Sequence, residues 1–127
     1  MVDVDHFKQV NDNYGHQVGD DVLRAVGAAL AEHVRHDDVV YRYGGEEFCV
    51  LLPGATPGEA NAVADRVVSA MRAILLPDGR HITVSVGVAD GRNGDVAETL
   101  ETADRALYAA KANGRDRAAA SDALESV

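Results

Sequence analysis

The amino-acid sequence predicts one α/β (α+β) domain, in which helices flank a central mixed sheet that carries a β-hairpin. Two observations support this prediction. Segments whose apolar residues have helical spacing alternate with short segments rich in β-branched residues. Near the middle of the chain, the pair Gly44-Gly45 separates two of these β-rich segments, as in a hairpin. The length of 127 residues suits a single domain.

The first half of the chain is expected to contain a strand, a helix and the hairpin. Met1 to Val4 reads as the end of a strand, and it is short for a central position in a sheet. Residues 20–34 are expected to form an amphipathic helix. Its apolar side chains at helical spacing are Val22, Leu23, Val26, Leu30 and Val34. Residues 39–43 and 48–52 form the arms of the hairpin.

The second half is expected to contain a helix, a strand and a final helix. Thr56 and Glu59 have the spacing of a capping box, which begins a helix that runs to about Leu75. Alternating apolar side chains predict a strand over residues 81–89. The last helix covers residues 96–112 and ends at Asn113-Gly114. From Ala118 the pattern is weak, so we expect a short C-terminal tail.

The composition of the chain limits the classes of partner. Twelve Lys and Arg against 21 Asp and Glu give a formal net charge of −9. A protein that binds a nucleic-acid polymer usually has the opposite balance, because phosphate neutralisation supplies most of its affinity. A phosphate-bearing ligand must therefore be met locally, which favours a small nucleotide.

Other sequence features indicate a cytoplasmic protein. No apolar run approaches the roughly 20 residues that span a bilayer. The first residues carry acids where a signal peptide carries a basic and then an apolar stretch. The single cysteine, Cys49, cannot form an internal disulfide, and we expect it to be a buried strand residue.

The turn Gly44-Gly45-Glu46-Glu47 holds two carboxylates at the tip of the hairpin. Glycine permits positive φ and a tight reversal. Taken alone, such a turn is more often a solvated loop with surface acids. Here, however, Asp3 ends the first strand, and ligands of α/β sheets commonly bind at that edge. Because Mg²⁺ favours one or two carboxylates together with substrate phosphates, Asp3 and Glu46 are candidate metal ligands.

Two further groups of residues have both a structural and a functional interpretation. Asn11 and Asp20 could read a base, since Asp accepts from N–H donors such as those of guanine. Alternatively, Asp20 caps the next helix and Gly15 breaks the previous one. Lys111 and Arg115 lie at a helix end, where cations interact with the macrodipole, but they could equally contact phosphates.

An ordered series of short motifs extends over nearly the whole chain. The motifs occupy residues 3–8, 11–12, 15–16, 19–20, 42–48, 83–89, 103–104, 106–108 and 111–117. In this order they closely resemble the GGDEF domain of diguanylate cyclases, in the variant whose turn reads Gly-Gly-Glu-Glu-Phe. The resemblance implies that residues 1–118 form this domain and that residues 119–127 are a tail. It also implies a fold like that of nucleotide cyclases and the polymerase palm.

The resemblance implies an enzyme of bacterial signalling. Such a nucleotidyltransferase condenses two GTP molecules into cyclic di-GMP and releases pyrophosphate. Each domain would hold one GTP, so catalysis would require a homodimer. The alternatives are a catalytically impaired cyclic di-GMP receptor and a GTP-binding regulatory module. The receptor usually has a degraded acidic turn, whereas the turn is intact here.

Site residues follow from the same resemblance. Asp3, the Val4 carbonyl and Glu46 would bind Mg²⁺ (or Mn²⁺). Glu46 would also act as the base for the ribose 3′-hydroxyl, and Glu47 would support the acidic cluster. The remaining positions would bind GTP, with two guanine readers, one residue that lines the guanine pocket and five that hold the triphosphate. The guanine readers are Asn11 and Asp20, and His16 lines the pocket. The residues that hold the triphosphate are His6, Phe7, Lys8, Lys111 and Arg115.

Two further implications concern regulation and completeness. Arg35 and Asp38 match the Arg-x-x-Asp site at which cyclic di-GMP inhibits these enzymes allosterically, and Arg66 matches an arginine that joins it. Relatives carry, before the position of Met1, a helix with a Leu-Thr-Gly-Leu-like motif, an Asn-Arg-Arg sequence and most of the first strand. We expect this chain to lack them, which puts the activity of the isolated domain in question.

Overall fold

The structure is a computed structural model and describes residues 1–92 and 94–121 of the chain. In chain order its elements are β1 (Val2–Val4), α1 (Phe7–Tyr14), α2 (His16–Glu32), β2 (Val39–Arg42), β3 (Glu47–Leu51), α3 (Pro57–Met71), β4 (Val84–Val88), α4 (Val96–Ala112) and β5 (Arg117–Ala120). Of these described helices, none is long and apolar enough to cross a membrane.

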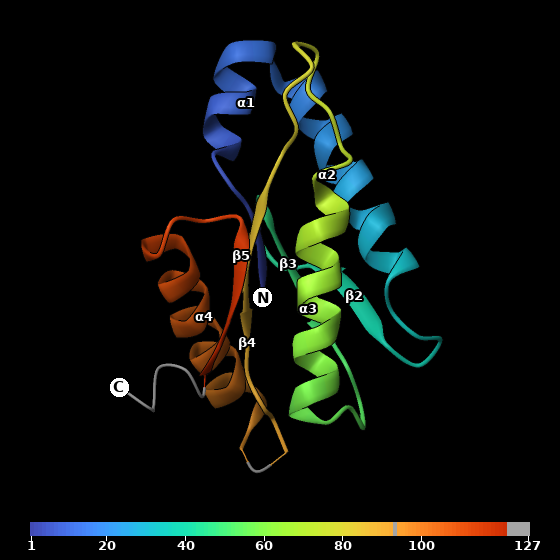
Figure 1. Cartoon of the computed structure of the whole chain (residues 1–127), viewed down its shortest axis with the longest axis vertical. Coiled ribbons are helices and arrows are strands. Elements are labelled where there is room, and N and C mark those ends of the chain that lie inside the picture. The colour runs from blue at the N-terminus through green and yellow to red at the C-terminus, as the bar shows by residue number, and fades with distance from the viewer. Residues whose placement is uncertain (93, 122–127) are drawn as a thin grey trace.

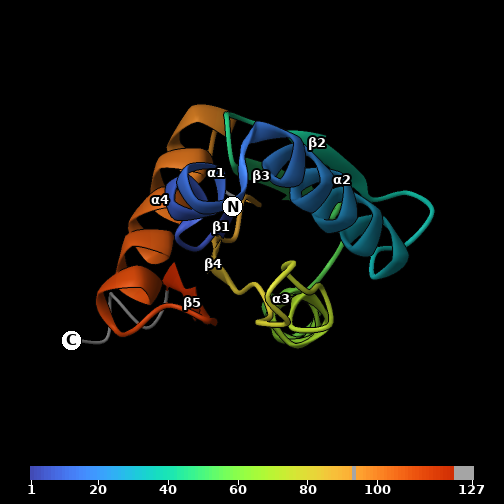
Figure 2. The ribbon, with the colours of Figure 1, turned by 90° about the horizontal axis from the view of Figure 1, so that it is seen from above.

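The strands form one mixed sheet in the order β2-β3-β1-β4-β5. All neighbours pair antiparallel except β4 and β5, which pair parallel. Helix α4 lies on one side of this sheet, and α2 and α3 lie on the other (Figures 1 and 2). Helix α1 follows β1 directly at one end of the sheet (Figure 1). The predicted α/β fold with a central mixed sheet and a hairpin is therefore confirmed.

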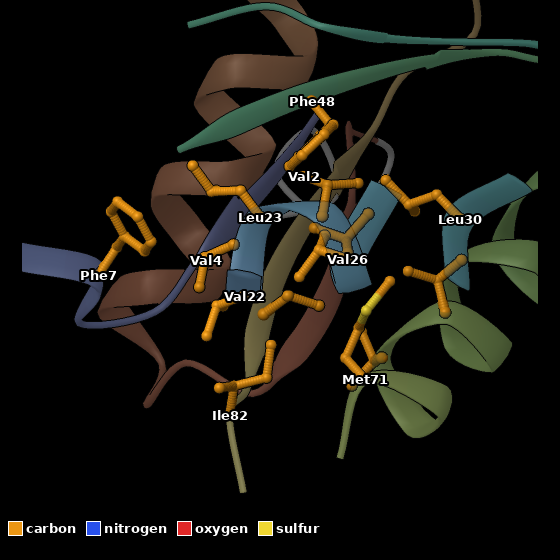
Figure 3. Close-up of a cluster of buried hydrophobic side chains, with 14 of the residues drawn as sticks. Val2, Val4, Phe7, Val22, Leu23, Val26, Leu30, Phe48, Met71 and Ile82 are labelled. Atoms are coloured by element: carbon orange, nitrogen blue, oxygen red, sulfur yellow. The ribbon is translucent and has the colours of Figure 1, made fainter. Parts of the chain in front are cut away.

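Strand β1 divides its side chains between the two faces of the sheet. Val2 and Val4 are buried in the main core, which β1 shares with helices α1, α2 and α3 (Figure 3). Met1 instead packs with Cys49 and with residues of α4 in a smaller cluster. Because side chains alternate along a strand, Asp3 also faces the α4 side. The buried strand position predicted for Cys49 is confirmed.

Although β1 has only three residues, it occupies the centre of the sheet. It pairs with β3 through Val2↔Phe48 and Asp3↔Glu47, and with β4 along its whole length. The α-amino group of Met1 also donates to the carbonyl of Gly87 at 2.9 Å, which continues the ladder. Its length therefore does not keep β1 from a central position, because both neighbours pair with it.

Several predicted elements are confirmed within a few residues. The hairpin arms are β2 and β3, and the last helix has the predicted bounds. Thr56 caps α3 through a capping box with Glu59, in which both hydrogen bonds measure 3.1 Å. The helix ends at Met71 rather than near Leu75. Tighter turns follow it, for example the one closed by the hydrogen bond from the Ile74 amide to the Met71 carbonyl.

The region between β1 and β2 differs from the prediction. Residues 7–14 form α1, and α2 begins at His16 instead of residue 20. Gly15, at φ +89°, separates the two helices, so its predicted role as a helix breaker is correct. Asp20 lies inside α2 and is not an N-cap. Helix α1 has only two buried side chains, Phe7 and Val10, which is why its sequence shows no apolar periodicity.

The strands near the C-terminus also differ from the prediction. Strand β4 begins at Val84, because residues 81–82 pair instead with residues 74–75 after α3. Residues 117–120, whose pattern is weak, form β5 beside β4. Alanine has low intrinsic strand propensity, so only pairing with β4 makes this segment a strand. The domain boundary predicted after residue 118 falls inside β5.

Gly87 allows α4 to approach the sheet closely, which gives a testable prediction. A Cβ at this position would overlap the carbonyl of Ala103 and would lie 2.9 Å from Leu107 Cα. We expect Gly87→Ala to lower the free energy of unfolding by about 1–3 kcal/mol, because the backbone of α4 must move. Urea titration measures this change.

The matched control is Gly27→Ala on α2, where the added methyl group would meet Phe48 at an ordinary 3.6 Å. This variant should be neutral or more stable by about 0.5–1 kcal/mol, because alanine favours the helix. Equal destabilisation of both variants would contradict a specific close approach at Gly87.

Candidate functional site

The carboxylates of the site meet where β1 lies beside β3. The strand register places Asp3 directly opposite Glu47, and the Val4 amide donates to the Glu46 carbonyl at 3.2 Å. Asp3 is almost fully buried. Its Oδ2 lies 3.1 Å from Nζ of Lys111, in the last turn of α4. The fold thus brings the predicted acidic cluster together with a predicted phosphate-binding cation.

Burial and nearby negative charge raise the pKa of these carboxyl groups above their ordinary values. Burial raises the pKa of Asp3, and the hydrogen bond and charge of Lys111 oppose that rise. Burial and then the negative charge of Asp3 raise the pKa of Glu46 and of Glu47. Asp104 on α4 raises the pKa of Glu47 further. A bound cation would relieve this repulsion.

The donor chemistry of the cluster fits a hard divalent cation that shares its ligands with a substrate. In residues 1–92 and 94–121, no three His, Cys, Asp or Glu side chains converge into a metal site of their own. Mg²⁺, however, is commonly bound by one or two carboxylates and completed by substrate phosphates. Asp3, Glu46 and the adjacent carbonyl of Val4 provide such a partial set.

The hairpin tip that carries Glu46 is held by a residue that the sequence analysis missed. The guanidinium of Arg42 donates to the carbonyls of Gly44 and Gly45, with Nε distances of 3.2 and 3.1 Å. The Tyr43 amide also donates to the Glu47 carbonyl at 2.8 Å. Neither glycine has positive φ, so the expectation that the turn uses Gly44-Gly45 for positive φ is wrong. An arginine two residues before a glycine pair gave no recognisable signal.

The three predicted phosphate contacts after β1 differ in exposure, since two are exposed and one is buried. His6 is exposed and left-handed at φ +56°, directly before α1. Phe7 is buried in the main core, so only its backbone is available to a ligand (Figure 3). Lys8 is exposed. No described side chain caps the first turn of α1. The Gln9 and Val10 amides donate to the His6 carbonyl, whereas the Phe7 and Lys8 amides precede the first bond within the helix.

The corner between α1 and α2 places the two predicted guanine readers near each other. A Cβ on Gly19 would overlap Oδ1 of Asn11, so the Asn11 amide lies against α2 one residue before Asp20. Asp20 also lines a hollow of about 340 Å³ with Arg42 and Phe48. His16 is exposed at the start of α2. Gly19 is thus a second contributor that sequence reasoning did not single out.

A larger cavity, of about 410 Å³, lies away from the carboxylates. Residues from β3, α3 and the segment after β4 line it, and Met1 and Cys49 lie at its wall. Its lining is mostly apolar. We locate the candidate site at Asp3 rather than here, because that region combines carboxylates of raised pKa with the cation of Lys111.

Arg115 also belongs to the cluster, although it lies beyond the end of α4. Its charge lowers the pKa of Asp3, which puts the guanidinium within electrostatic reach of that carboxylate. Its backbone is left-handed at φ +64°. Lys111 and Arg115 therefore both lower the pKa of Asp3, and their role in phosphate binding stays a prediction.

The predicted inhibitory site lies at a separate place, between α2, β2 and α3. The Arg35 amide donates to Oδ2 of Asp38 at 2.7 Å, and the Arg35 guanidinium lies 3.8 Å from the carboxylates of Asp38 and Glu59. The Arg35 side chain is 60% exposed, whereas that of Asp38 is 2% exposed. Arg66 is exposed on α3. The arginines are accessible to a ligand, whereas the Asp38 carboxylate already accepts the Arg35 amide.

Comparison with known proteins decides the family. A sequence profile described as "Diguanylate cyclase, GGDEF domain" matches residues 1–117. The chain belongs to the GGDEF family. Membership confirms the resemblance seen in the motifs of the sequence.

Two curated relatives of this GGDEF chain are diguanylate cyclases by name. Diguanylate cyclase DosC of Escherichia coli (strain K12) is 39% identical over 122 residues, which cover 92% of the chain and 26% of DosC. Diguanylate cyclase A of Treponema denticola is 42% identical over 123 residues, which cover 92% of the chain and 33% of the relative. The chain therefore spans about a quarter to a third of their length.

A solved structure agrees with the GGDEF fold described above. The GGDEF domain of DgcB from Caulobacter crescentus, in complex with c-di-GMP, superimposes with a TM-score of 0.87. It is 33% identical in sequence, and the match covers 95% of this chain and 75% of that one.

The crowded carboxylates of this GGDEF domain give a prediction for stability as a function of pH. Because the folded state raises the pKa of Glu47 above its ordinary value, ionisation of this group costs stability at neutral pH. Glu47→Gln should therefore raise the free energy of unfolding at pH 7 without divalent cation. The gain should shrink as pH falls through the raised pKa of folded Glu47 and should be absent below about 4.5, where both states are protonated. Urea titrations across this range, with EDTA present, measure it.

The matched control is Glu101→Gln, which changes an exposed carboxylate on α4. It should leave stability nearly unchanged at both ends of the range. Destabilisation by Glu47→Gln at neutral pH would show that the charge of Glu47 stabilises the fold, contrary to this interpretation.

Proposed function

We propose that this chain is a diguanylate cyclase domain that condenses two GTP molecules into cyclic di-GMP and releases pyrophosphate. The observation that carries the proposal is the cluster in which Asp3 pairs with Lys111 and lies opposite Glu47, next to Glu46. Carboxylates for a metal lie there beside cations for phosphate. The named diguanylate cyclases among the relatives support the same activity.

In the proposed reaction, the 3′-oxygen of each GTP attacks the α-phosphorus of the other, so two phosphodiester bonds form and two pyrophosphates leave. The bond from that phosphorus to the pyrophosphate oxygen breaks, and the hydroxyl proton goes to a base. Glu46 is suited to this role, because its raised pKa brings the carboxylate closer to the proton affinity that the step needs. Lys111 and Arg115 stabilise the charge that develops on the phosphoryl and leaving-group oxygens.

A divalent cation, Mg²⁺ or Mn²⁺, would be held by Asp3, the Val4 carbonyl and Glu46. When bound, it supplies a Lewis acid to the triphosphate and neutralises the carboxylates. Glu47 adds negative charge to the cluster from the position opposite Asp3.

The α1–α2 corner is the proposed nucleotide pocket. Asn11 and Asp20 would hydrogen-bond the guanine edge, with His16 beside them. The backbone around His6 and Phe7 and the side chain of Lys8 would hold phosphates at the start of α1.

The proposed catalytic unit is a homodimer of this domain. One domain holds one GTP, so two domains must face each other for the two nucleotides to react. The unit would comprise residues 1–118, and β5 extends it to Ala120. We place it in the cytoplasm, where GTP is available. Cyclic di-GMP would inhibit it by binding at Arg35, Asp38 and Arg66.

The role of Glu46 gives the first test. Glu46→Gln should lower turnover about 10²- to 10⁴-fold, as expected for loss of a general base, while GTP binding changes little. Mass spectrometry of nucleotides after incubation with GTP and Mg²⁺ measures turnover, and calorimetry measures binding. Glu101→Gln is the matched control and should retain activity.

Two results would contradict this role. Undiminished turnover in Glu46→Gln would remove Glu46 from catalysis. Tight GTP binding by the unmodified chain without any product, at high protein concentration, would favour a GTP-binding regulatory module instead of an enzyme.

Product inhibition gives the second test. Arg35→Ala should raise the cyclic di-GMP concentration needed for half-inhibition about tenfold or more, because a charge-assisted contact to phosphate is lost. Its uninhibited turnover should stay close to that of the unmodified protein, since Arg35 lies away from the carboxylate cluster. Arg105→Ala, an exposed arginine on α4, is the control. Unchanged inhibition in Arg35→Ala would place the inhibitory site elsewhere.

A further inference from the structure

Asp5 is a buried carboxylate to which the proposed reaction assigns no role. It is 5% exposed and lies at the end of β1, on the α4 side of the sheet. Its Oδ1 accepts from the Ser85 hydroxyl at 2.7 Å, and its Oδ2 accepts from the Thr83 hydroxyl at 2.7 Å. These two bonds fix the carboxylate against β4.

A third hydrogen bond connects Asp5 to the turn after α4. The backbone N–H of Asp116 donates to Oδ2 of Asp5 at 3.0 Å, across 111 positions of sequence. On its other side, the Asp116 carboxylate accepts from Nε of Arg72 at 3.0 and 3.3 Å. The turn is therefore held at the Asp116 amide by buried Asp5 and at the Asp116 carboxylate by Arg72 on the surface.

The backbone of this turn needs such support. Arg115 and Asp116 both have positive φ, at +64° and +50°. Residues with a Cβ rarely adopt this conformation, and two in succession persist only where the surrounding contacts determine them. Without the carboxylate of Asp5, the Asp116 N–H would lose its buried acceptor, and the turn could relax to negative φ.

We propose that Asp5 is a positioning residue for Arg115. By holding the Asp116 N–H, its carboxylate keeps the Arg115-Asp116 turn left-handed and thereby fixes the direction in which the Arg115 side chain leaves the backbone. This inference rests on the proposed function, in which Arg115 contacts the triphosphate.

A double-mutant cycle separates positioning from a general contribution to stability. The readout is the dissociation constant of a non-hydrolysable GTP analogue with Mg²⁺, measured by calorimetry on the full chain. Asp5→Ala should weaken binding about tenfold or more, because the arginine contact to phosphate is lost. In the Arg115→Ala background, Asp5→Ala should weaken binding less than about twofold. Additive losses would overturn the proposal.

Conservative and control variants sharpen the cycle. Asp5→Asn should recover most of the affinity, because the amide oxygen can still accept from the Asp116 N–H. Asp5→Ser leaves a hydroxyl for Thr83 and Ser85 but is too short to reach Asp116, so it should behave like Asp5→Ala and serves where that variant does not fold. Asp95→Ala removes the N-cap at the opposite end of α4 and should leave analogue binding unchanged.

Amide hydrogen exchange tests the same link without any nucleotide. The Asp116 N–H should exchange about tenfold faster or more in Asp5→Ala and Asp5→Ser, but not in Asp95→Ala. Unchanged exchange at Asp116 would overturn the proposal. If the unmodified chain binds no GTP analogue, the proposed function fails, and the exchange result alone then decides whether Asp5 holds the turn.

Discussion

The alternation of side chains along β1 is the constraint on which both the core and the candidate site depend. Val2 and Val4 enter the main core, while Asp3 and Asp5 face the α4 side of the sheet. A shift of one residue in register would place the aspartates in the apolar core and the valines on the α4 side. Antiparallel pairing with both β3 and β4 prevents such a shift.

From this arrangement follows the electrostatic character of the site. Asp3 lies opposite Glu47, and burial raises the pKa of both. Negative charge adds to the rise, from Asp5 for Asp3 and from Asp3 for Glu47. Such crowding destabilises the unliganded protein, and it is typical of sites where a cation or a reacting group supplies the missing compensation. Lys111 supplies part of that compensation through its contact with Asp3.

Helix α4 connects the stability of the fold with the placement of these cations. It packs directly on Gly87 of β4, which brings its last turn with Lys111 to the carboxylates. The turn that follows carries Arg115 and is held by Asp5 and Arg72. The same contacts that close the sheet with β5 therefore also orient the basic side of the site.

Much of the fold was predictable wherever local sequence signals agree with the tertiary structure. The capping box at Thr56, the hairpin arms and the bounds of α4 all have strong local signals, and the structure has them. Helix α1 and strand β5 were not predicted. The first has only two apolar positions, and the second consists largely of alanines that become a strand through pairing with β4.

The order of motifs by itself determined the family of this protein and its set of candidate residues, because such a series needs no three-dimensional information. Only the tertiary structure decided how those residues meet. Register placed Asp3 opposite Glu47, and packing at Gly19 set Asn11 beside α2. Hydrogen bonds to residues far away in the sequence fixed Asp5. These contacts arise from the pairing of strands and the packing of helices, and no local pattern in the chain encodes them.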